Sequence, residues 1–194
     1  MNGNKLAWWI VGGAIVGIVI IYLAISGAIK IPSGVRTAEE TGPLATATSQ
    51  GIVAAPGLSP VSKEGQVVNK NTGAPVKLDV TPGSPDAPQQ SDPIALRDAP
   101  TNSIKISMSA EGIAPSTFRV KRGEVVTLTL TATDNQTHVF AFEDSSLSAV
   151  AVGLAPGETR VTAFNAPSAR GEYQFYCNVP GHATRGETGT MIVE

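Results

Sequence analysis

The sequence predicts an all-β fold, a Greek-key β-sandwich, in the carboxy-terminal half of the chain. From residue 103 onward, short runs of alternating apolar and polar residues are separated by turn residues, and no helical period of comparable strength occurs. All five phenylalanines lie between Phe118 and Phe175, so the aromatic side chains available for a core are concentrated there. An antiparallel sandwich of about seven short strands accounts for both observations.

The alternation also places the individual strands. In the first, Ile104, Ile106 and Met108 alternate with polar residues, and turn signals lie at residues 122–123, 155–157 and 169–171. The further strands are expected at residues 117–120, 125–130, 138–142, 159–165, 173–177 and 190–193.

The amino-terminal end contains an uncharged run of 24 residues, from Leu6 to Ile29. At 1.5 Å per residue this run is long enough to cross the roughly 30 Å hydrocarbon layer, so it predicts a single transmembrane helix. The alternative is a cleaved signal peptide, with Ala24 and Ser26 before the cleavage site. Under both interpretations the rest of the chain is exported, and we expect it on the periplasmic or extracellular side of the cell membrane.

Residues 31–100 differ in composition from the segments on either side. They contain no aromatic residue and hold ten of the fourteen prolines. Such a segment buries too little apolar surface to offset the entropy of ordering it, so it predicts a flexible, disordered linker. The expected organisation is a membrane anchor over residues 1–30, a linker over 31–100 and one folded domain over 101–194.

Charge excludes some classes of partner. The net charge is −2, and Lys and Arg never occur in runs longer than two residues. A nucleic-acid surface and a polybasic lipid-binding patch are therefore not expected. The single cysteine excludes an intramolecular disulfide, which leaves a free thiol, a metal ligand or a nucleophile.

The only two histidines and the only cysteine all lie in the predicted sandwich. His138 opens a strand, Cys177 ends another, and His182 follows Cys177 by five residues across a loop. Strand ends meet in a sandwich, so the two imidazoles and the thiolate are predicted to converge. A thiolate is a soft ligand that favours Cu(I), and a trigonal His-His-Cys set is typical of electron-transfer copper sites. Zinc usually recruits a fourth strong ligand.

Other interpretations apply to these residues when each is taken alone. A lone Cys in a strand is commonly a small apolar core residue, and a loop His is commonly solvated. A Cys-His nucleophilic pair lacks a recognisable residue to orient the base. The joint placement favours one copper ion cycling between Cu(I) and Cu(II), and no enzymatic activity, because no histidine remains for a second metal site.

Three segments carry a family resemblance: residues 118–126, His138 after a polar turn, and residues 171–182, which include Cys177-Asn-Val-Pro-Gly-His182. Over about the last 92 residues the sequence resembles a cupredoxin, a type 1 blue-copper-like domain. The Cys-x4-His spacing is similar to that of azurins and membrane-anchored sulfocyanin-like proteins. The resemblance implies that His138, Cys177 and His182 are the equatorial copper ligands, and that transient redox proteins are the partners.

The sequence departs from the family pattern after the second histidine. Glu187 stands where several relatives have an axial Met, and Met191 is displaced into the last strand, where we expect a core residue. Glu187 could coordinate the metal, point to solvent, or leave the axial position to another group. A carboxylate oxygen would favour Cu(II) and lower the reduction potential.

Together these expectations describe a membrane-tethered mononuclear copper protein that carries single electrons between extracytoplasmic redox partners. Copper delivery or storage is the alternative, because it would use the same ligands.

Overall fold

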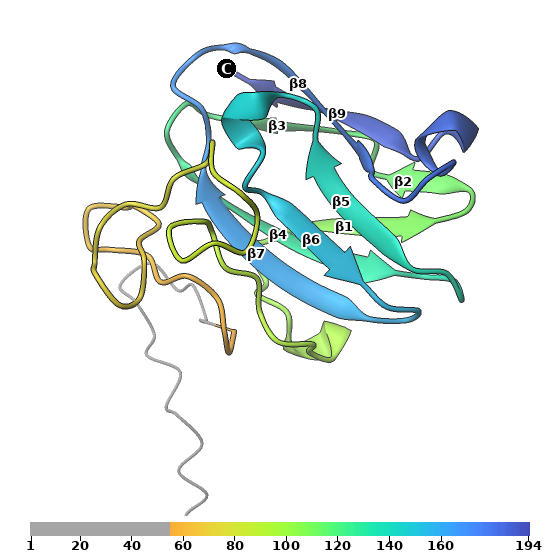
Figure 1. Ribbon diagram of the computed structural model, residues 1–194, viewed down its shortest axis with the longest axis horizontal. Coiled ribbons are helices and arrows are strands. Elements are labelled where there is room, and N and C mark those ends of the chain that lie inside the picture. Colours follow the sequence, from red (N-terminus) through yellow and green to blue (C-terminus); the bar gives the residue numbers. More distant parts are fainter. Residues whose placement is uncertain (1–54) are drawn as a thin grey trace, which may run out of the picture. The chain divides into compact units, whose positions relative to one another are not determined.

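The computed structural model describes residues 55–194 and contains nine strands and three short 3-10 helices in that part of the chain (Figure 1). The predicted transmembrane run lies outside the described residues. Among residues 55–194, none of the helices has the length and apolar character needed to cross a membrane. The strands are β1 (Ile104–Ser109), β2 (Gly112–Ala114), β3 (Thr117–Val120), β4 (Val125–Ala132), β5 (His138–Phe142), β6 (Ala151–Leu154), β7 (Thr159–Asn165), β8 (Gly171–Cys177) and β9 (Thr188–Val193); the helices are η1 (Leu96–Asp98), η2 (Ser145–Leu147) and η3 (Ala183–Arg185).

The strands form two sheets, with the orders β2-β1-β4-β7 and β3-β9-β8-β5-β6. Both sheets contain neighbouring strands that are not consecutive in sequence, such as β1 and β4 or β8 and β5, as expected for a Greek-key sandwich rather than a simple meander. The expectation of a purely antiparallel arrangement is wrong, because β1 pairs with β4 and β3 pairs with β9 in parallel. In both cases the chain leaves the sheet and returns, and such a crossover permits parallel pairing.

All seven predicted strands are present, several with the predicted bounds. Two further strands, β2 and β6, were not predicted. β2 has only three residues, and β6 contains Gly153 in a run without polar alternation. Both are too short or too irregular to produce a period-two signal.

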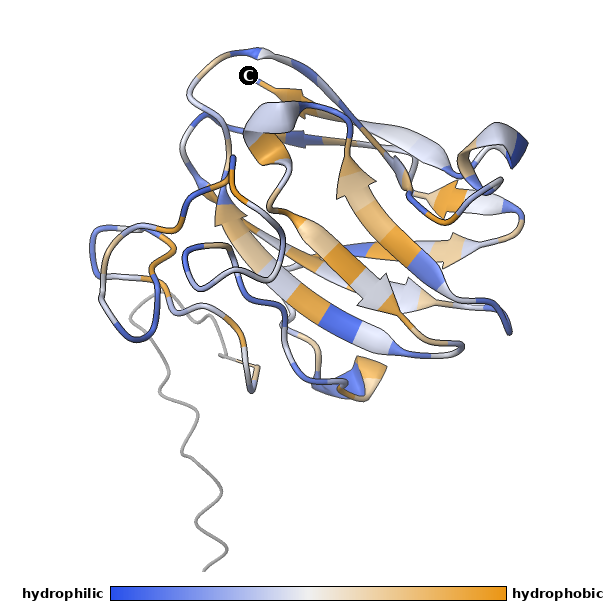
Figure 2. Ribbon diagram, viewed as in Figure 1, coloured by the Kyte–Doolittle hydropathy of each residue, from blue (hydrophilic) through white to orange (hydrophobic). Residues whose placement is uncertain are grey.

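The core lies between the two sheets and is built around aromatic rings. Phe140, Phe164 and Phe175 are fully buried, and the Phe140 and Phe175 ring centres are 5.1 Å apart. Apolar residues recur along β5, β6 and β7 (Figure 2). Met191 is 0% exposed in the same core cluster, which confirms that it is a core residue. The packed core fixes the strand ends from which the candidate site is built.

The structure corrects the linker prediction for residues 55–100, which we call the arm. Backbone hydrogen bonds attach the arm to the open edge of β7, from Ser91 N to Val161 O at 2.7 Å and from Ile94 N to Thr159 O at 3.0 Å. Composition missed this attachment because backbone groups of almost any sequence can pair with an unpaired sheet edge.

A small apolar cluster supports these hydrogen bonds. Leu58 and Val67 of the arm are buried against Val161 and Ala163 of β7. Asn165, the last residue of β7, accepts a hydrogen bond from Val67 N at 2.8 Å and donates to Gly65 O at 2.9 Å. The arm is therefore ordered without a single aromatic side chain.

The start of the arm and the β8–β9 connection lie at opposite ends of the sandwich. In Figure 1 the first part of the arm, drawn in orange and yellow, lies at the left, and the connection that contains η3 lies at the right. The histidines, the cysteine and Glu187 belong to the η3 end. The chain therefore enters the described part far from these residues.

Candidate metal centre

The four residues singled out in the sequence come from three places in the fold. His138 begins β5, Cys177 ends β8, and His182 and Glu187 flank η3 in the connection to β9. The structure brings all four together: their potential ligand atoms lie within 4.8 Å of one another, and all four residues are buried. This is the only group of three or more His, Cys, Asp or Glu side chains suited to a metal within residues 55–194.

Separations between the donor atoms test whether a metal ion fits. With metal–ligand bonds of roughly 2.0–2.3 Å, donors about 120° apart lie roughly 3.5–3.7 Å from each other, and donors at a right angle about 3 Å. Cys177 Sγ lies 3.4 Å from His182 Nδ1 and 3.8 Å from His138 Nδ1. Glu187 Oε2 lies 2.9 Å from His138 Nδ1 and 3.1 Å from His182 Nδ1. These distances suit a single metal ion, which His138, Cys177, His182 and Glu187 would hold together.

Glu187 points into the site, so the alternative in which it faces solvent is wrong. Its side chain is 0% exposed, and Oε2 contacts both histidine rings. A hydrophobic environment normally excludes a carboxylate unless charges and hydrogen bonds compensate for its burial. Glu187 therefore joins the two histidines and the cysteine as a candidate ligand.

Asp134 sets the tautomer of His138. Its Oδ1 lies 2.9 Å from His138 Nε2, and this hydrogen bond, together with backbone N–H groups of Gln136 and Ala110, lowers the pKa of Asp134 to about 2. An ionised carboxylate can only accept, so Nε2 carries the proton and the Nδ1 lone pair faces the site. The facing Nδ1 and Oε2 atoms then require a cation between them, either a proton or a metal ion.

Backbone contacts fix Cys177. The Val139 N–H donates to Sγ at 3.4 Å, and the Cys177 N–H donates to the carbonyl oxygen of Glu187 at 3.0 Å. Burial raises the pKa of the Cys177 thiol. We therefore expect the metal-free protein to hold a neutral thiol, and metal binding to release its proton.

Arg185 secures the outer oxygen of Glu187. Its Nε and Nη2 lie 2.8 and 2.7 Å from Oε1, and Nη2 also donates to Gln136 Oε1 at 2.8 Å. Burial alone would raise the pKa of Glu187, but the hydrogen bonds from Arg185 and His138 outweigh it, so this pKa lies below the usual range. The carboxylate is therefore ionised and available as a ligand.

Sequence reasoning missed Asp134, Gln136 and Arg185. Asp134 and Gln136 belong to the polar turn before His138, and a turn motif does not indicate which of its side chains will contact a histidine or an arginine. Arg185 lies two residues before Glu187, and a cation so close to a candidate buried acid was a usable signal.

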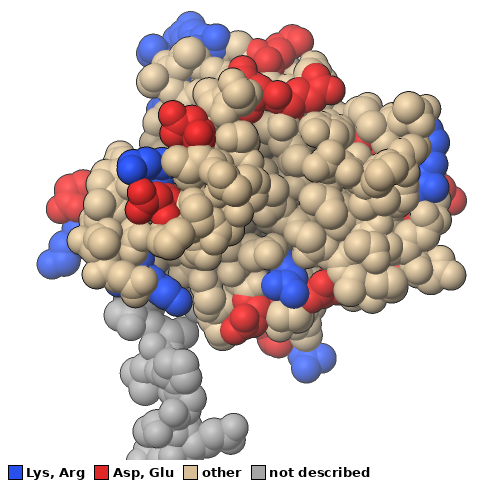
Figure 3. Space-filling view, in the orientation of Figure 1, with Lys and Arg blue, Asp and Glu red and all other residues tan. Residues whose placement is uncertain are grey.

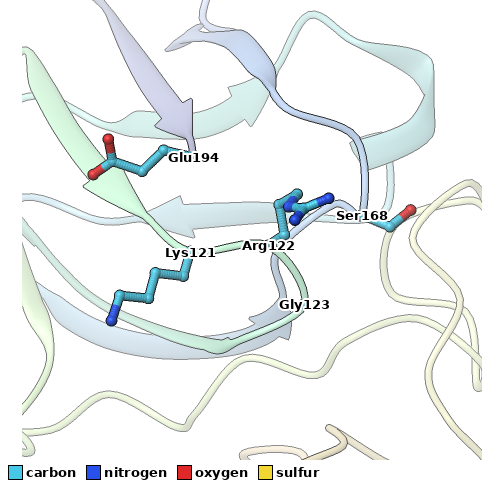
Figure 4. Close-up of a pocket in the computed structure, with 5 residues that line it drawn as sticks. All are labelled: Lys121, Arg122, Gly123, Ser168 and Glu194. Atoms are coloured by element: carbon cyan, nitrogen blue, oxygen red, sulfur yellow. The ribbon is translucent and has the colours of Figure 1, made fainter.

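Other surface features do not resemble this centre. On the face drawn in Figure 3, groups of both charge signs are scattered over a largely uncharged surface. A separate pocket is lined by Lys121, Arg122, Gly123, Ser168 and Glu194 (Figure 4). Its five lining residues are exposed and include neither histidine nor cysteine. The pocket therefore lacks the donors of a transition-metal site.

The donor set suits copper in particular. One thiolate, two imidazoles and a single oxygen donor, all within 4.8 Å of one another, form the kind of soft donor set that copper favours in electron-transfer sites. The site could therefore bind one copper ion.

Among solved structures, the chain is similar to auracyanins and amicyanins. Reduced auracyanin from the photosynthetic bacterium Roseiflexus castenholzii is 24% identical, with 47% of this chain and 96% of that chain covered and a TM-score of 0.43. Auracyanin A from Chloroflexus aurantiacus, described as a blue copper protein, is 20% identical, with coverages of 47% and 99% and a TM-score of 0.40. Amicyanin from Paracoccus versutus is 19% identical, with coverages of 53% and 92% and a TM-score of 0.41.

No curated protein matches the chain significantly. The sequence profile of the cupredoxin-like domain family, in contrast, matches residues 87–193, which include the whole sandwich and the end of the arm. Because this match spans more than half of the chain, the protein belongs to the cupredoxin-like domain family.

Proposed function

We propose that this protein is a mononuclear copper protein that carries one electron at a time. The observation that carries the proposal is the convergence of His138, Cys177, His182 and Glu187 at separations that fit a single copper ion. A bound copper ion would supply one-electron chemistry by alternating between Cu(I) and Cu(II). The residues of the chain hold the ion, limit its rearrangement and connect it to the surface.

Rigid ligands suit an electron carrier, because little then moves when the oxidation state changes. His138 is hydrogen-bonded through Nε2 to Asp134, and Cys177 is held at the end of β8 by the Val139 N–H. His182 begins a short loop that is stabilised by a backbone hydrogen bond, in which Arg185 N donates to His182 O at 3.1 Å. Each ligand is therefore positioned by the folded protein before any metal binds.

His182 offers the route for electrons between the ion and a partner. Its side chain is 10% exposed, whereas the side chains of His138 and Glu187 are 0% exposed. The residues next to it in the chain, from Val179 to Ala183, are uncharged. We propose that partner redox proteins dock here transiently, through a small, weakly charged contact.

We propose that the uncharged run Leu6–Ile29 tethers the protein to the cell membrane, with the copper domain on the extracytoplasmic side. Support comes from the length and apolar character of this run. The start of the arm lies at the end of the sandwich remote from η3 (Figure 1). Tethering would raise the frequency of encounters with membrane-bound redox proteins.

Copper delivery or storage would use the same ligands but would need exchangeable copper. Three of the four candidate ligands are at most 1% exposed, and His182 is 8% exposed. Such burial favours retention of the ion and therefore the carrier function. Ready loss of copper to a chelator after reduction, without a reversible electrochemical wave, would instead support delivery.

The test is voltammetry of the copper-loaded full-length chain and of Glu187→Met. A thioether favours Cu(I) more than a carboxylate does, so we expect the substitution to shift the Cu(I)/Cu(II) preference at least tenfold toward Cu(I), about 59 mV for one electron. Glu143→Met, an exposed acid at the other end of β5, is the matched control and should leave the potential near the wild-type value. An unchanged potential and spectrum in Glu187→Met would exclude Glu187 as an axial ligand.

A further inference from the structure

The two oxygens of the Glu187 carboxylate make different contacts. Oε2 faces inward, 2.9 and 3.1 Å from the two histidine Nδ1 atoms. Oε1 faces outward, where it accepts a hydrogen bond from Arg185 Nε at 2.8 Å and forms an ion pair with Arg185 Nη2 at 2.7 Å. Both guanidinium nitrogens contact the same carboxylate oxygen, so turning Oε1 toward the site would break both contacts with Arg185.

Arg185 is itself held in place. Its Nη2 also donates to Gln136 Oε1 at 2.8 Å, so the guanidinium bridges the loop after β4 and the loop before β9. Its side chain is 37% exposed, which places it between the buried carboxylate and solvent. Arg185 is the only Lys or Arg that pairs with Glu187 in the described part of the chain.

The charges at the site depend on its oxidation state. The Cys177 thiolate and the Glu187 carboxylate together neutralise a divalent ion, but with a monovalent ion they leave one excess negative charge. A fixed positive charge next to Glu187 offsets it and therefore stabilises the reduced state relative to the oxidised state.

We propose that Arg185 is a positioning residue that holds Glu187 so that only one carboxylate oxygen faces the site. We further propose that its charge keeps the reduction potential higher than the four candidate ligands would give without it. This inference rests on the proposed copper function. It assigns to Arg185 both a geometric and an electrostatic role, and it explains how a buried carboxylate can occupy this position in a site that must also be stable when reduced.

The first test uses the metal-free protein. The acceptor Oε1 is buried, so the Arg185 Nε–H signal in nuclear magnetic resonance spectra should exchange slowly with water, and the Glu187→Gln variant should exchange it at least tenfold faster. Exchange in the wild-type protein as fast as that of the exposed Arg170 would overturn the positioning role.

The second test compares the potentials of copper-loaded full-length variants. Arg185→Met should shift the Cu(I)/Cu(II) preference at least tenfold toward Cu(II), about 59 mV to lower potential for one electron. Arg185→Lys, which keeps the charge, should remain within threefold of wild type. Arg119→Met is the matched control, because it removes an arginine that pairs with Glu194 at the carboxy-terminal end of β9, and it should also remain within threefold.

The outcomes separate this inference from the proposed function. If Arg185→Met stays within threefold of wild type while all variants keep the thiolate-to-copper absorption band, the role of Arg185 is wrong and the copper function stands. If the wild-type protein lacks that band, the copper function fails and the inference fails with it. Should Arg185→Met not fold, Arg185→Gln removes the same charge while retaining a donor and is expected to show the same tenfold shift.

Discussion

The metal centre and the arm are both ordered mainly by polar contacts, but they use these contacts differently. At the centre, the side chains of His138 and Glu187 are fully buried. An ionised side chain on the side away from the site contacts each of them: Asp134 contacts His138, and Arg185 contacts Glu187. In the arm, hydrogen bonds join backbone groups to the edge of β7, as between Ser91 and Val161. Polar contacts to the arm therefore complete a sheet edge, whereas those at the centre leave the candidate ligand atoms facing one another.

The difference predicts that the two regions can be perturbed separately. Substitutions next to the centre should change the copper spectrum as well as stability, and substitutions in the contacts of the arm should change stability alone. Three substitutions test this separation, in order of decreasing expected effect.

Gly189→Ala should disturb the metal end most. Gly189 lies in β9 two residues after Glu187, and a Cβ there would clash with the Phe175 ring and the Ser116 carbonyl oxygen. Overpacking of this kind typically costs about 1–3 kcal/mol, and the shift of β9 should also change the copper spectrum. Urea unfolding and absorption spectra measure both effects.

Gly153→Ala in β6 is the control, because a Cβ at that position meets nothing within 4 Å. It should unfold like the wild-type protein. Equal stability of the two alanine variants would show that close packing at Gly189 does not position the centre.

Asn165→Ala should loosen the arm without affecting copper. Asn165 accepts from Val67 N and donates to Gly65 O and Gly123 O, so the substitution removes three hydrogen bonds. Each hydrogen bond contributes about 1 kcal/mol to stability, and the contributions do not add completely, so we expect the free energy of unfolding to fall by about 1–3 kcal/mol. A changed copper spectrum in Asn165→Ala would contradict the separation of the two regions.

A smaller effect, dependent on pH, is expected at Glu158. Burial alone would raise the pKa of this carboxyl, but the Ala155 N–H and the Arg160 guanidinium outweigh it and lower the pKa. A depressed folded-state pKa stabilises the protein above the unfolded-state pKa, and this stabilisation is lost as pH falls through the folded-state value. Arg160 also donates to Ser91 O at 3.1 Å, which links Glu158 to the arm.

Glu158→Gln should therefore lower the thermal midpoint at neutral pH and approach the wild-type midpoint in acid. Melting curves across that range, with copper absent, measure the difference. A gap between the two proteins that is constant with pH would mean that the charge of Glu158 is not what stabilises this contact.

Much of the sandwich could be predicted from the sequence, because alternating residues in strands such as Thr117–Val120 and Ile104–Ser109 bury one face of a sheet. The parallel pairs and the arm could not. Parallel pairing depends on the path of the whole chain, and the arm is attached through backbone groups that every sequence possesses.

The candidate site followed a similar division. His138, Cys177 and His182 could be identified because each residue type is scarce in the chain, and the structure brings them together. The inward orientation of Glu187 could not be predicted, because it depends on Arg185 and on the two histidine rings in space. Side chains that compensate a buried charge are distributed over loops that no sequence period connects.

The most direct test of the copper centre is optical absorption with electron paramagnetic resonance on the copper-loaded full-length chain and on Cys177→Ser. We predict a thiolate-to-copper charge-transfer band and the signal of one Cu(II) ion in the wild-type protein, with the band lost in Cys177→Ser. Copper bound by the wild-type protein without any thiolate-to-copper band would contradict the account.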